Sequence, residues 1–143
     1  SELLGAERVR ASEDVAEGLG LRPGDPIHKI DRLRLADGRP MAVETSMLSA
    51  ARFPNLTRRM RSAGSLHAVL RESYGVQLRR GEESIDTAPA SPREAALLEC
   101  DTGSPMLVVR RRSFDTDGLA VEWGTTWFRG DRITLIAYLM TPE

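Results

Sequence analysis

Charged and hydrophobic side chains alternate from Arg32 through Leu35, and the turn-forming pair Asp37-Gly38 then leads into a second strand-like run. Because successive side chains on a strand point to opposite faces, this pattern predicts a β-hairpin in which Arg32 and Arg34 share one face. Two guanidiniums on a buried face repel each other and lose hydration. We therefore expect an anionic group between them.

The turn over residues 36–38 sets the register of this hairpin, because a three-residue loop with a left-handed glycine pairs Leu35 with Arg39. One face then carries Leu33, Leu35, Met41 and Val43, and the other carries Ile30, Arg32, Arg34, Ala42 and Glu44. A two-residue turn would instead place Arg34 opposite Met41, so the better apolar match favours the longer loop. In that register Glu44 lies diagonal to Arg32 and within its reach. The alternative is a solvated face with an ordinary cross-strand ion pair.

The rest of the chain predicts a strand-rich fold with few short helices. Strands are expected at 6–11, 27–35, 40–48, 77–87, 106–115, 119–129 and 133–139, and helices after the capping residues Ser12, Ser65 and Ser91. An irregular crossing segment begins at Phe53. Hairpin links between the strands favour an α+β domain built on an antiparallel β-sheet flanked by short helices. The segment 133–139 is apolar on both faces, as a central strand or a subunit interface would be.

Length and composition indicate one ordinary globular domain. Of the 143 residues, 41% are hydrophobic and 29% are charged, and no apolar run is long enough to span a bilayer, so no membrane partner is expected. Cys100 is the single cysteine and two histidines are present, so we expect a cytoplasmic protein without internal disulfide, metal site or cofactor. The net charge is −1 and the basic residues are dispersed, which argues against nucleic-acid binding by this chain itself.

Ser65 is a second candidate for anion binding. As the N-cap of a predicted helix it satisfies a free backbone amide, and that role alone explains a serine there. Helix N-termini also bind anions, through free N–H groups and the positive end of the dipole. If the fold brings Ser65 to Arg32 and Arg34, these groups form a phosphate or carboxylate cradle. Leu66 and His67 follow directly and are further candidates for ligand contact.

Glu122 lies on the second predicted hairpin, whose loop over 116–118 places Arg112 directly across from it. Phe128 shares a face with Glu122, and a carboxylate beside an aromatic wall suits hydroxyls or an amine on a small ligand. A plain cross-strand ion pair is the alternative. No serine or cysteine has a matched histidine and carboxylate, and no spacing supports Glu44 and Glu122 as an acid–base pair, so no catalytic residue is expected.

Taken together, these stretches resemble the UTRA domain, the effector-sensing half of the HutC-type branch of the GntR family of bacterial transcription regulators. The residues that carry the resemblance follow the family order over nearly the whole chain: Arg32-Leu-Arg-Leu-Ala-Asp-Gly-Arg-Pro to Glu44, Ser65-Leu66 to Tyr74-Gly75-Val76, Gly103-Ser104-Pro105-Met106-Leu107, Asp117-Gly118-Leu-Ala-Val-Glu122 and Phe128-Arg129-Gly130-Asp131-Arg132. The resemblance implies a chorismate-lyase-like fold with a non-catalytic pocket for a small metabolite. It also implies a winged-helix DNA-binding domain that precedes residues 1–143 and is absent from this chain, so operator DNA is an expected partner only through that domain.

The resemblance also implies roles for the candidate residues. In amino-sugar-sensing members, the ligand phosphate is held by the residues that match Arg32, Arg34 and Ser65, and the sugar is met by those that match Glu44, Glu122 and Phe128. A tyrosine is usual at the Phe128 position, so one hydroxyl contact is missing here. We expect a non-enzymatic sensor of an anionic metabolite, such as a sugar phosphate, in a homodimeric regulator whose operator affinity the effector changes. A chorismate-lyase-like enzyme and a dimerisation module with a vestigial pocket are the alternatives.

Overall fold

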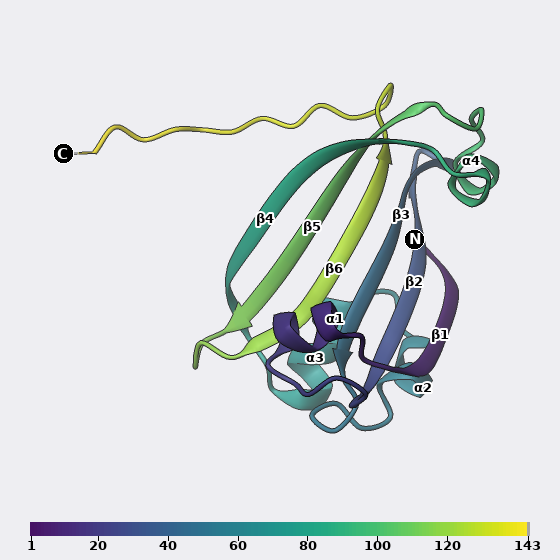
Figure 1. Cartoon of the computed structure of the whole chain (residues 1–143). Helices are drawn as coiled ribbons and strands as arrows, with labels where there is room; N and C mark the ends of the chain where they lie inside the picture. Colours follow the sequence, from purple (N-terminus) through teal and green to yellow (C-terminus); the bar gives the residue numbers. More distant parts are fainter. Residues whose placement is uncertain (143) are drawn as a thin grey trace.

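The computed structural model describes residues 1–142, in which one six-stranded antiparallel β-sheet forms the centre of the fold (Figure 1). Across the sheet the strands follow the order β1-β2-β3-β6-β5-β4. The strands are β1 (Glu2–Arg10), β2 (Pro26–Ala36), β3 (Arg39–Ser49), β4 (Leu78–Pro89), β5 (Pro105–Asp115) and β6 (Ala120–Arg129). The helices are α1 (Glu13–Leu19), α2 (Leu56–Met60), α3 (Leu66–Tyr74) and α4 (Pro92–Leu98). The expected α+β architecture, an antiparallel sheet flanked by short helices, is confirmed.

The helices divide between the two faces of the sheet. On one face, which we call the α3 face, α2 and α3 pack against Ile30 and Leu48. On the opposite face, which we call the α1 face, α1 packs on Ile27 and α4 packs on Val43. Each face of the sheet therefore has its own hydrophobic core. Burial of apolar surface stabilises each core by about 25 cal/mol per Å². Alternate residues of one strand therefore serve different cores.

Serine caps begin three of the helices, as the sequence predicts. The side chains of Ser12, Ser65 and Ser91 each accept a hydrogen bond from a backbone amide in the first turn of α1, α3 and α4. Ser91 and Glu94 form the complete reciprocal capping box. These caps place the beginning of α3 at Leu66, which decides where Ser65 and His67 lie.

The turn between β2 and β3 differs from the expected three-residue loop. Asp37 and Gly38 have φ values of 52° and 76°, so they form a two-residue turn. A β-bulge beside the Arg34–Leu35 step then shifts the register by one residue, with Met41 as the extra residue on β3. The shorter turn alone would place Arg32 and Arg34 on the same face as Val43. The bulge shifts the pairing by one more residue and returns them to the face of Ala42 and Glu44. The two arginines therefore keep the face that the longer loop predicted for them.

The actual register changes two further expectations for this hairpin. Arg32 lies directly opposite Glu44, not diagonal to it. Met41, which was expected on the face of Leu33, packs instead beside the cluster that contains Phe128. The new partner of Arg32 follows from the shorter turn and the bulge together, because each moves the pairing by one position, and Met41 changes face because it is the unpaired residue of the bulge.

A second bulge changes the hairpin between β5 and β6. It lies next to Phe114 and shifts the register by one residue, so that Ser113 is opposite Glu122 and Arg112 is opposite Trp123. The expected pairing of Arg112 with Glu122 is therefore wrong. Arg112 points to the α1 face, because neighbouring side chains on a strand alternate between the faces.

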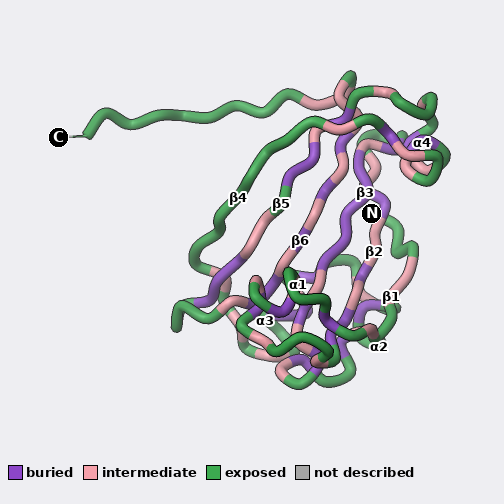
Figure 2. The backbone as a smooth tube through the Cα atoms, in the orientation of Figure 1, coloured by how far each residue is buried: buried purple, intermediate pink, exposed green. Residues whose placement is uncertain are grey.

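Two segments outside the hairpins also differ from expectation. Helix α2 begins at Leu56, inside the segment that was expected to be irregular. Residues 133–142 contain no helix or strand, and they extend away from the body and are largely exposed (Figures 1 and 2). The prediction of a central strand at 133–139 is therefore wrong. The preceding strand β6 already has β3 and β5 on its two sides, so no position next to it is free. Within residues 1–142 no helix is long and apolar enough to cross a membrane.

Candidate functional site

A row of alternating charges crosses the α3 face of the sheet. Arg32 Nη2 lies 3.3 Å from Glu44 Oε2, and Arg111 Nη2 lies 3.3 Å from Oε1 of the same carboxylate. Arg111 Nη1 also lies 3.6 Å from Oε1 of Glu83 on the edge strand β4. The side chains of Arg32 and Glu44 are 13% and 8% exposed, so their attraction is screened less than that of a surface pair. Glu44 is thus shared by two guanidiniums.

Arg111 is a member of this site that the sequence interpretation missed. The expected register directed Arg112 to this face, and the bulge in the hairpin exchanges it for Arg111. The residue opposite Arg111 on β6 is Gly124, where an added Cβ would lie 3.6 Å from Glu122 Oε2. The glycine leaves the surface of β6 open, so that Arg111 and Glu44 meet across it. Gly124 lies on β6, between β3, which carries Glu44, and β5, which carries Arg111. This glycine is the signal in the sequence that could have indicated the Arg111–Glu44 pair.

Glu122 is a buried carboxylate with one oxygen left free. Its side chain is 1% exposed, and its Oε2 accepts a hydrogen bond of 2.6 Å from the Ser46 hydroxyl. Its Oε1 has no hydrogen-bond partner and lies 3.9 Å from Nε2 of His67. Burial alone would raise the pKa of Glu122, but His67 and Ser46 outweigh burial and the pKa lies below its ordinary value. The carboxylate is therefore charged at neutral pH and presents a free acceptor.

Arg34 lies over the ring of Phe128, with its guanidinium carbon 5.9 Å from the ring centroid. Such a cation–π contact holds the side chain without neutralising its charge. Within residues 1–142, Arg34 forms no ion pair, and Nε of both Arg32 and Arg111 is buried without a hydrogen-bond partner. The site therefore holds a surplus of hydrogen-bond donors for an anion.

The beginning of α3 contributes less direct contact than the sequence predicts. Ser65 is exposed, and its Oγ accepts a hydrogen bond of 3.3 Å from the Ala68 amide, so it acts as the helix cap. Leu66 is 1% exposed and belongs to the core. No hydrogen bond in the described part of the chain joins Ser65 to Arg32 or Arg34. The three-part cradle remains a prediction.

The chemistry of this arrangement suits recognition. Three guanidiniums, two buried carboxylates and an imidazole lie on one face of the sheet, and the carboxylates are already engaged by arginine or serine. Guanidiniums bind phosphate and carboxylate through paired N–H groups, while a free carboxylate oxygen accepts from an ammonium or hydroxyl. The site can therefore hold a small molecule that carries an anion together with donors.

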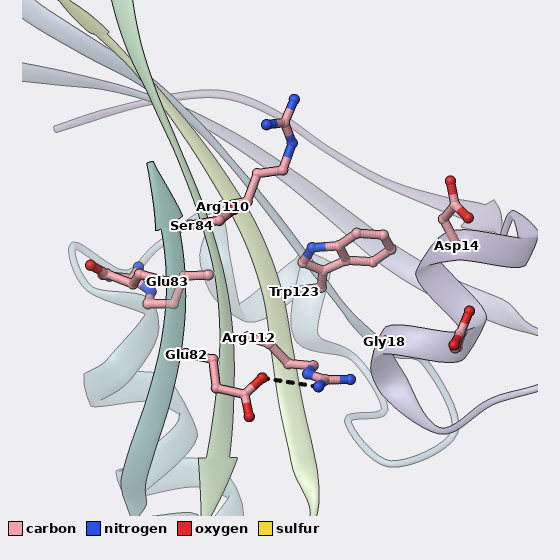
Figure 3. A pocket seen from close by; sticks show the side chains of 10 residues that line it. Asp14, Gly18, Glu82, Glu83, Ser84, Arg110, Arg112 and Trp123 are labelled. Atoms are coloured by element: carbon pink, nitrogen blue, oxygen red, sulfur yellow. Dashed lines mark hydrogen bonds and ion pairs between the residues drawn. The ribbon is translucent and has the colours of Figure 1, made fainter. Parts of the chain in front are cut away.

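A cavity of about 660 Å³ lies on the α1 face between α1, β4 and β5 (Figure 3). Trp123 forms its centre, with Asp14 on the α1 side and the ion pair of Arg112 with Glu82, 3.0 Å apart, on the strand side. Arg110 also lines the cavity and pairs with Asp86 at 3.0 Å. Arg110 is exposed and Arg112 half-buried, and each of the two already has a carboxylate partner.

Comparisons with known proteins give a consistent result. The family model described as the UTRA domain matches residues 1–134. The transcriptional repressor PhnF of Mycolicibacterium smegmatis is 38% identical over 131 residues, which cover 92% of this chain and 53% of that protein. The transcriptional repressor NagR of Bacillus subtilis is 28% identical over 139 residues, covering 97% of this chain and 57% of NagR. The chain therefore spans about half the length of these curated relatives.

The fold is shared with solved structures of the same kind. The crystal structure of the effector domain of PhnF from Mycobacterium smegmatis superposes with a TM-score of 0.88 at 35% identity, covering 98% of this chain and 86% of that chain. The crystal structure of PhnF from the same organism gives a TM-score of 0.90 at 36% identity, over 98% of this chain and 62% of that one. The similarity extends through all six strands, since nearly the whole chain is covered.

Proposed function

The chain belongs to the UTRA domain family, and we propose that it is the effector-sensing domain of a GntR-type transcription regulator of the HutC subfamily. Its effector is a small anionic metabolite, such as a sugar phosphate. Arg32 and Arg34 hold the anion with the beginning of α3 at Ser65, and Glu44, Glu122 and Phe128 select the remainder of the molecule. His67 completes the wall at α3, and Leu66 anchors this end of the helix in the core.

The observation that supports this proposal most strongly is the surplus of cationic donors on a largely buried surface. Arg34 has no carboxylate partner among the described residues, and Arg32 keeps a buried Nε without a hydrogen bond. Buried donors that lack partners cost free energy, so an anionic ligand that satisfies them gains affinity. The free Oε1 of Glu122 gives the same ligand an acceptor for a hydroxyl or amine.

Binding is coupled to operator DNA through a winged-helix domain outside this chain. Coupling between an effector site and a second site is typically worth about 1–3 kcal/mol, or roughly 5- to 150-fold in affinity. The regulator acts as a homodimer, in which a change at the sensing domains alters the spacing of the DNA-reading heads. The named relatives PhnF and NagR are transcriptional repressors, which fits a domain that binds its ligand without converting it.

A thermal-shift screen of the purified chain tests this proposal. The panel contains sugar phosphates, amino sugars, carboxylates and inorganic phosphate. Near 100 times Kd a ligand should stabilise the fold by about 2.7 kcal/mol, which corresponds to several degrees in Tm. A selective shift by one anionic compound supports the sensor function. No shift from any anion contradicts it and favours the dimerisation module.

A further inference from the structure

We propose that residues 134–140, which we call the arm, add a strand to the edge strand β4 of a second copy of this chain. The second copy places its own arm on β4 of the first, so the two chains exchange arms. The inference rests on the proposed function for the existence of a homodimer and assigns the interface of that dimer. It makes no use of the anion site.

The arm carries a run of large apolar side chains that point into solvent. It extends away from the body of the domain, beyond the end of the sheet (Figures 1 and 2). Four of its residues are between 72% and 94% exposed: Ile136, Tyr138, Leu139 and Met140. Soluble proteins rarely expose a contiguous apolar surface of this kind unless it contacts a partner. Residues 133–142 carry no charge and are apolar on both faces of an extended strand, which is typical of a strand that is covered on both sides.

The segment just before the arm is anchored to the sheet. The amide of Gly130 donates to the carbonyl of Pro105 over 3.0 Å, and a Cβ at this glycine would lie 2.7 Å from the same oxygen. Arg132 Nη1 donates to the Pro40 carbonyl over 2.7 Å, and Ile133 packs beside a hydrophobic cluster of β3, β5 and β6. The arm therefore leaves the domain from a fixed base. It cannot pair with β6, whose two sides are taken by β3 and β5.

The edge strand β4 is suited to receive an arm. It pairs with β5 on one side only, and its twelve residues make it long for an edge strand. Among the described residues, Leu78 at its beginning is the one member of β4 in a hydrophobic cluster, and Ile85 in its middle is 53% exposed. The other edge strand, β1, packs Ala6 and Val9 against the cores. The apolar arm therefore has more open surface to cover along β4.

The charges of β4 leave its outer edge open to a neutral strand. Free charges on an edge strand normally protect it from pairing with another chain. Here three acidic side chains are neutralised from within the sheet, in the pairs Glu82–Arg112, Glu83–Arg111 and Asp86–Arg110. An uncharged arm therefore meets paired charges and the exposed side chain of Ile85.

Length and symmetry favour a second copy as the partner. Fully extended at roughly 3.3 Å per residue, residues 134–140 reach about 23 Å, which is enough to pair along about half of β4. Because the arm and the edge that receives it belong to the same chain, two copies satisfy each other in a closed pair with two-fold symmetry. Such a pair covers both arms and both β4 edges.

Sedimentation equilibrium tests the exchange by measuring the dimer Kd of the wild-type chain and its variants. One variant stops at Ile133, which removes the arm but keeps the residue that packs on the sheet. Ile136→Lys changes the arm, Ile85→Lys changes the edge, and Leu119→Lys is the control, an apolar residue that is 57% exposed in the β5–β6 turn. We expect the wild type to dimerise and the shortened chain to be monomeric. Ile136→Lys and Ile85→Lys should each weaken the dimer roughly tenfold or more, because an apolar contact is lost and a charge is buried, while Leu119→Lys matches the wild type.

A monomeric wild type, or a dimer that survives removal of the arm, overturns the inference. A dimer that is lost without the arm but is unchanged in Ile85→Lys overturns the assignment of β4. The thermal-shift screen separates these failures from failure of the sensor function. An anion that still raises the Tm of a monomeric wild type leaves the sensor function standing, whereas a chain that dimerises through its arm but responds to no anion contradicts the sensor function alone.

Discussion

Arg32 lies directly across the β2–β3 hairpin from Glu44, and its Nη2 is 3.3 Å from Oε2 of that carboxylate. Removing one member of a buried ion pair usually leaves the other charge uncompensated, at a large cost in stability. Here the cost is reduced, because Arg111 contacts the second oxygen of Glu44 and keeps it paired. Arg32 can therefore be replaced to test ligand binding without losing the fold.

Replacing Arg34 with alanine should weaken binding of the anionic ligand that the screen identifies by roughly tenfold or more, because a charged donor is lost. The fold should lose only the contact with Phe128, worth about 0.5–1 kcal/mol. Calorimetry and thermal unfolding of the same variant measure the two effects. The control is Arg39→Ala, an exposed arginine of the same hairpin. Equal affinity in the two variants would exclude Arg34 from the site.

Gly18→Ala should destabilise the chain, although alanine normally favours a helix over glycine by about 1 kcal/mol. A Cβ at Gly18 would lie 3.0 Å from Cε3 and 3.2 Å from Cδ2 of the Trp123 ring. We expect a loss of about 1–3 kcal/mol in the free energy of unfolding by urea, because α1 or the Trp123 ring must shift to admit the methyl group. Gly64→Ala is the control, because its Cβ meets open space. A more stable Gly18→Ala chain would contradict this packing.

Glu122 should make the chain less stable in acid. Although burial would raise its pKa, His67 and Ser46 lower the pKa below the ordinary value of 4.5. The unfolded chain then binds the proton first, so the contribution of Glu122 is present above pH 4.5 and is lost as the pH falls toward the folded pKa. Urea unfolding at several pH values should show a smaller acid loss for Glu122→Gln than for the wild type. Identical pH dependence in the two chains would contradict a lowered pKa.

His28 should produce a separate pH effect nearer to neutrality. Burial lowers its pKa below 6.5 and the charge of Arg8 adds to this, while the hydrogen bond to the Phe53 carbonyl opposes them. The unfolded chain therefore takes up the proton first as the pH falls through 6.5, and the free energy of unfolding decreases there. Urea unfolding between about pH 7.5 and pH 5.5 should show this decrease in the wild type and a flatter curve in His28→Gln. A decrease of equal size in both chains would assign the effect to another group.

Local signals were sufficient to predict much of the fold. Ser65 and Ser91 cap helices because their hydroxyls satisfy amides within four residues, and this depends on nothing distant. The position of the turn in the first hairpin and the shared face of Arg32 and Arg34 were also predicted, although the turn has two residues, Asp37 and Gly38, and not the three expected. A helix cap is determined by residues close together in the sequence, so the sequence of that short segment is sufficient to predict it.

Features that depend on tertiary packing were missed. The bulges at Met41 and beside Phe114 respond to packing across the sheet, and each changes the register by one residue. This is why Arg112 was expected where Arg111 lies. The apolar segment 133–139 has the composition of a strand, but the sheet order leaves no place next to β6. A subunit interface through this segment remains a prediction.

The central claim is that Arg32 binds the anion of an effector, and calorimetric titration of one variant tests it most directly. The anionic compound that gives the largest thermal shift is titrated into the wild-type chain, Arg32→Ala, and the exposed control Arg58→Ala. We expect Arg32→Ala to lose binding by at least roughly a hundredfold, the scale of a lost buried charge-assisted contact, while Arg58→Ala keeps the wild-type Kd. A folded Arg32→Ala chain that binds within about threefold of the wild type, less than the contribution of a single hydrogen bond, would contradict the account.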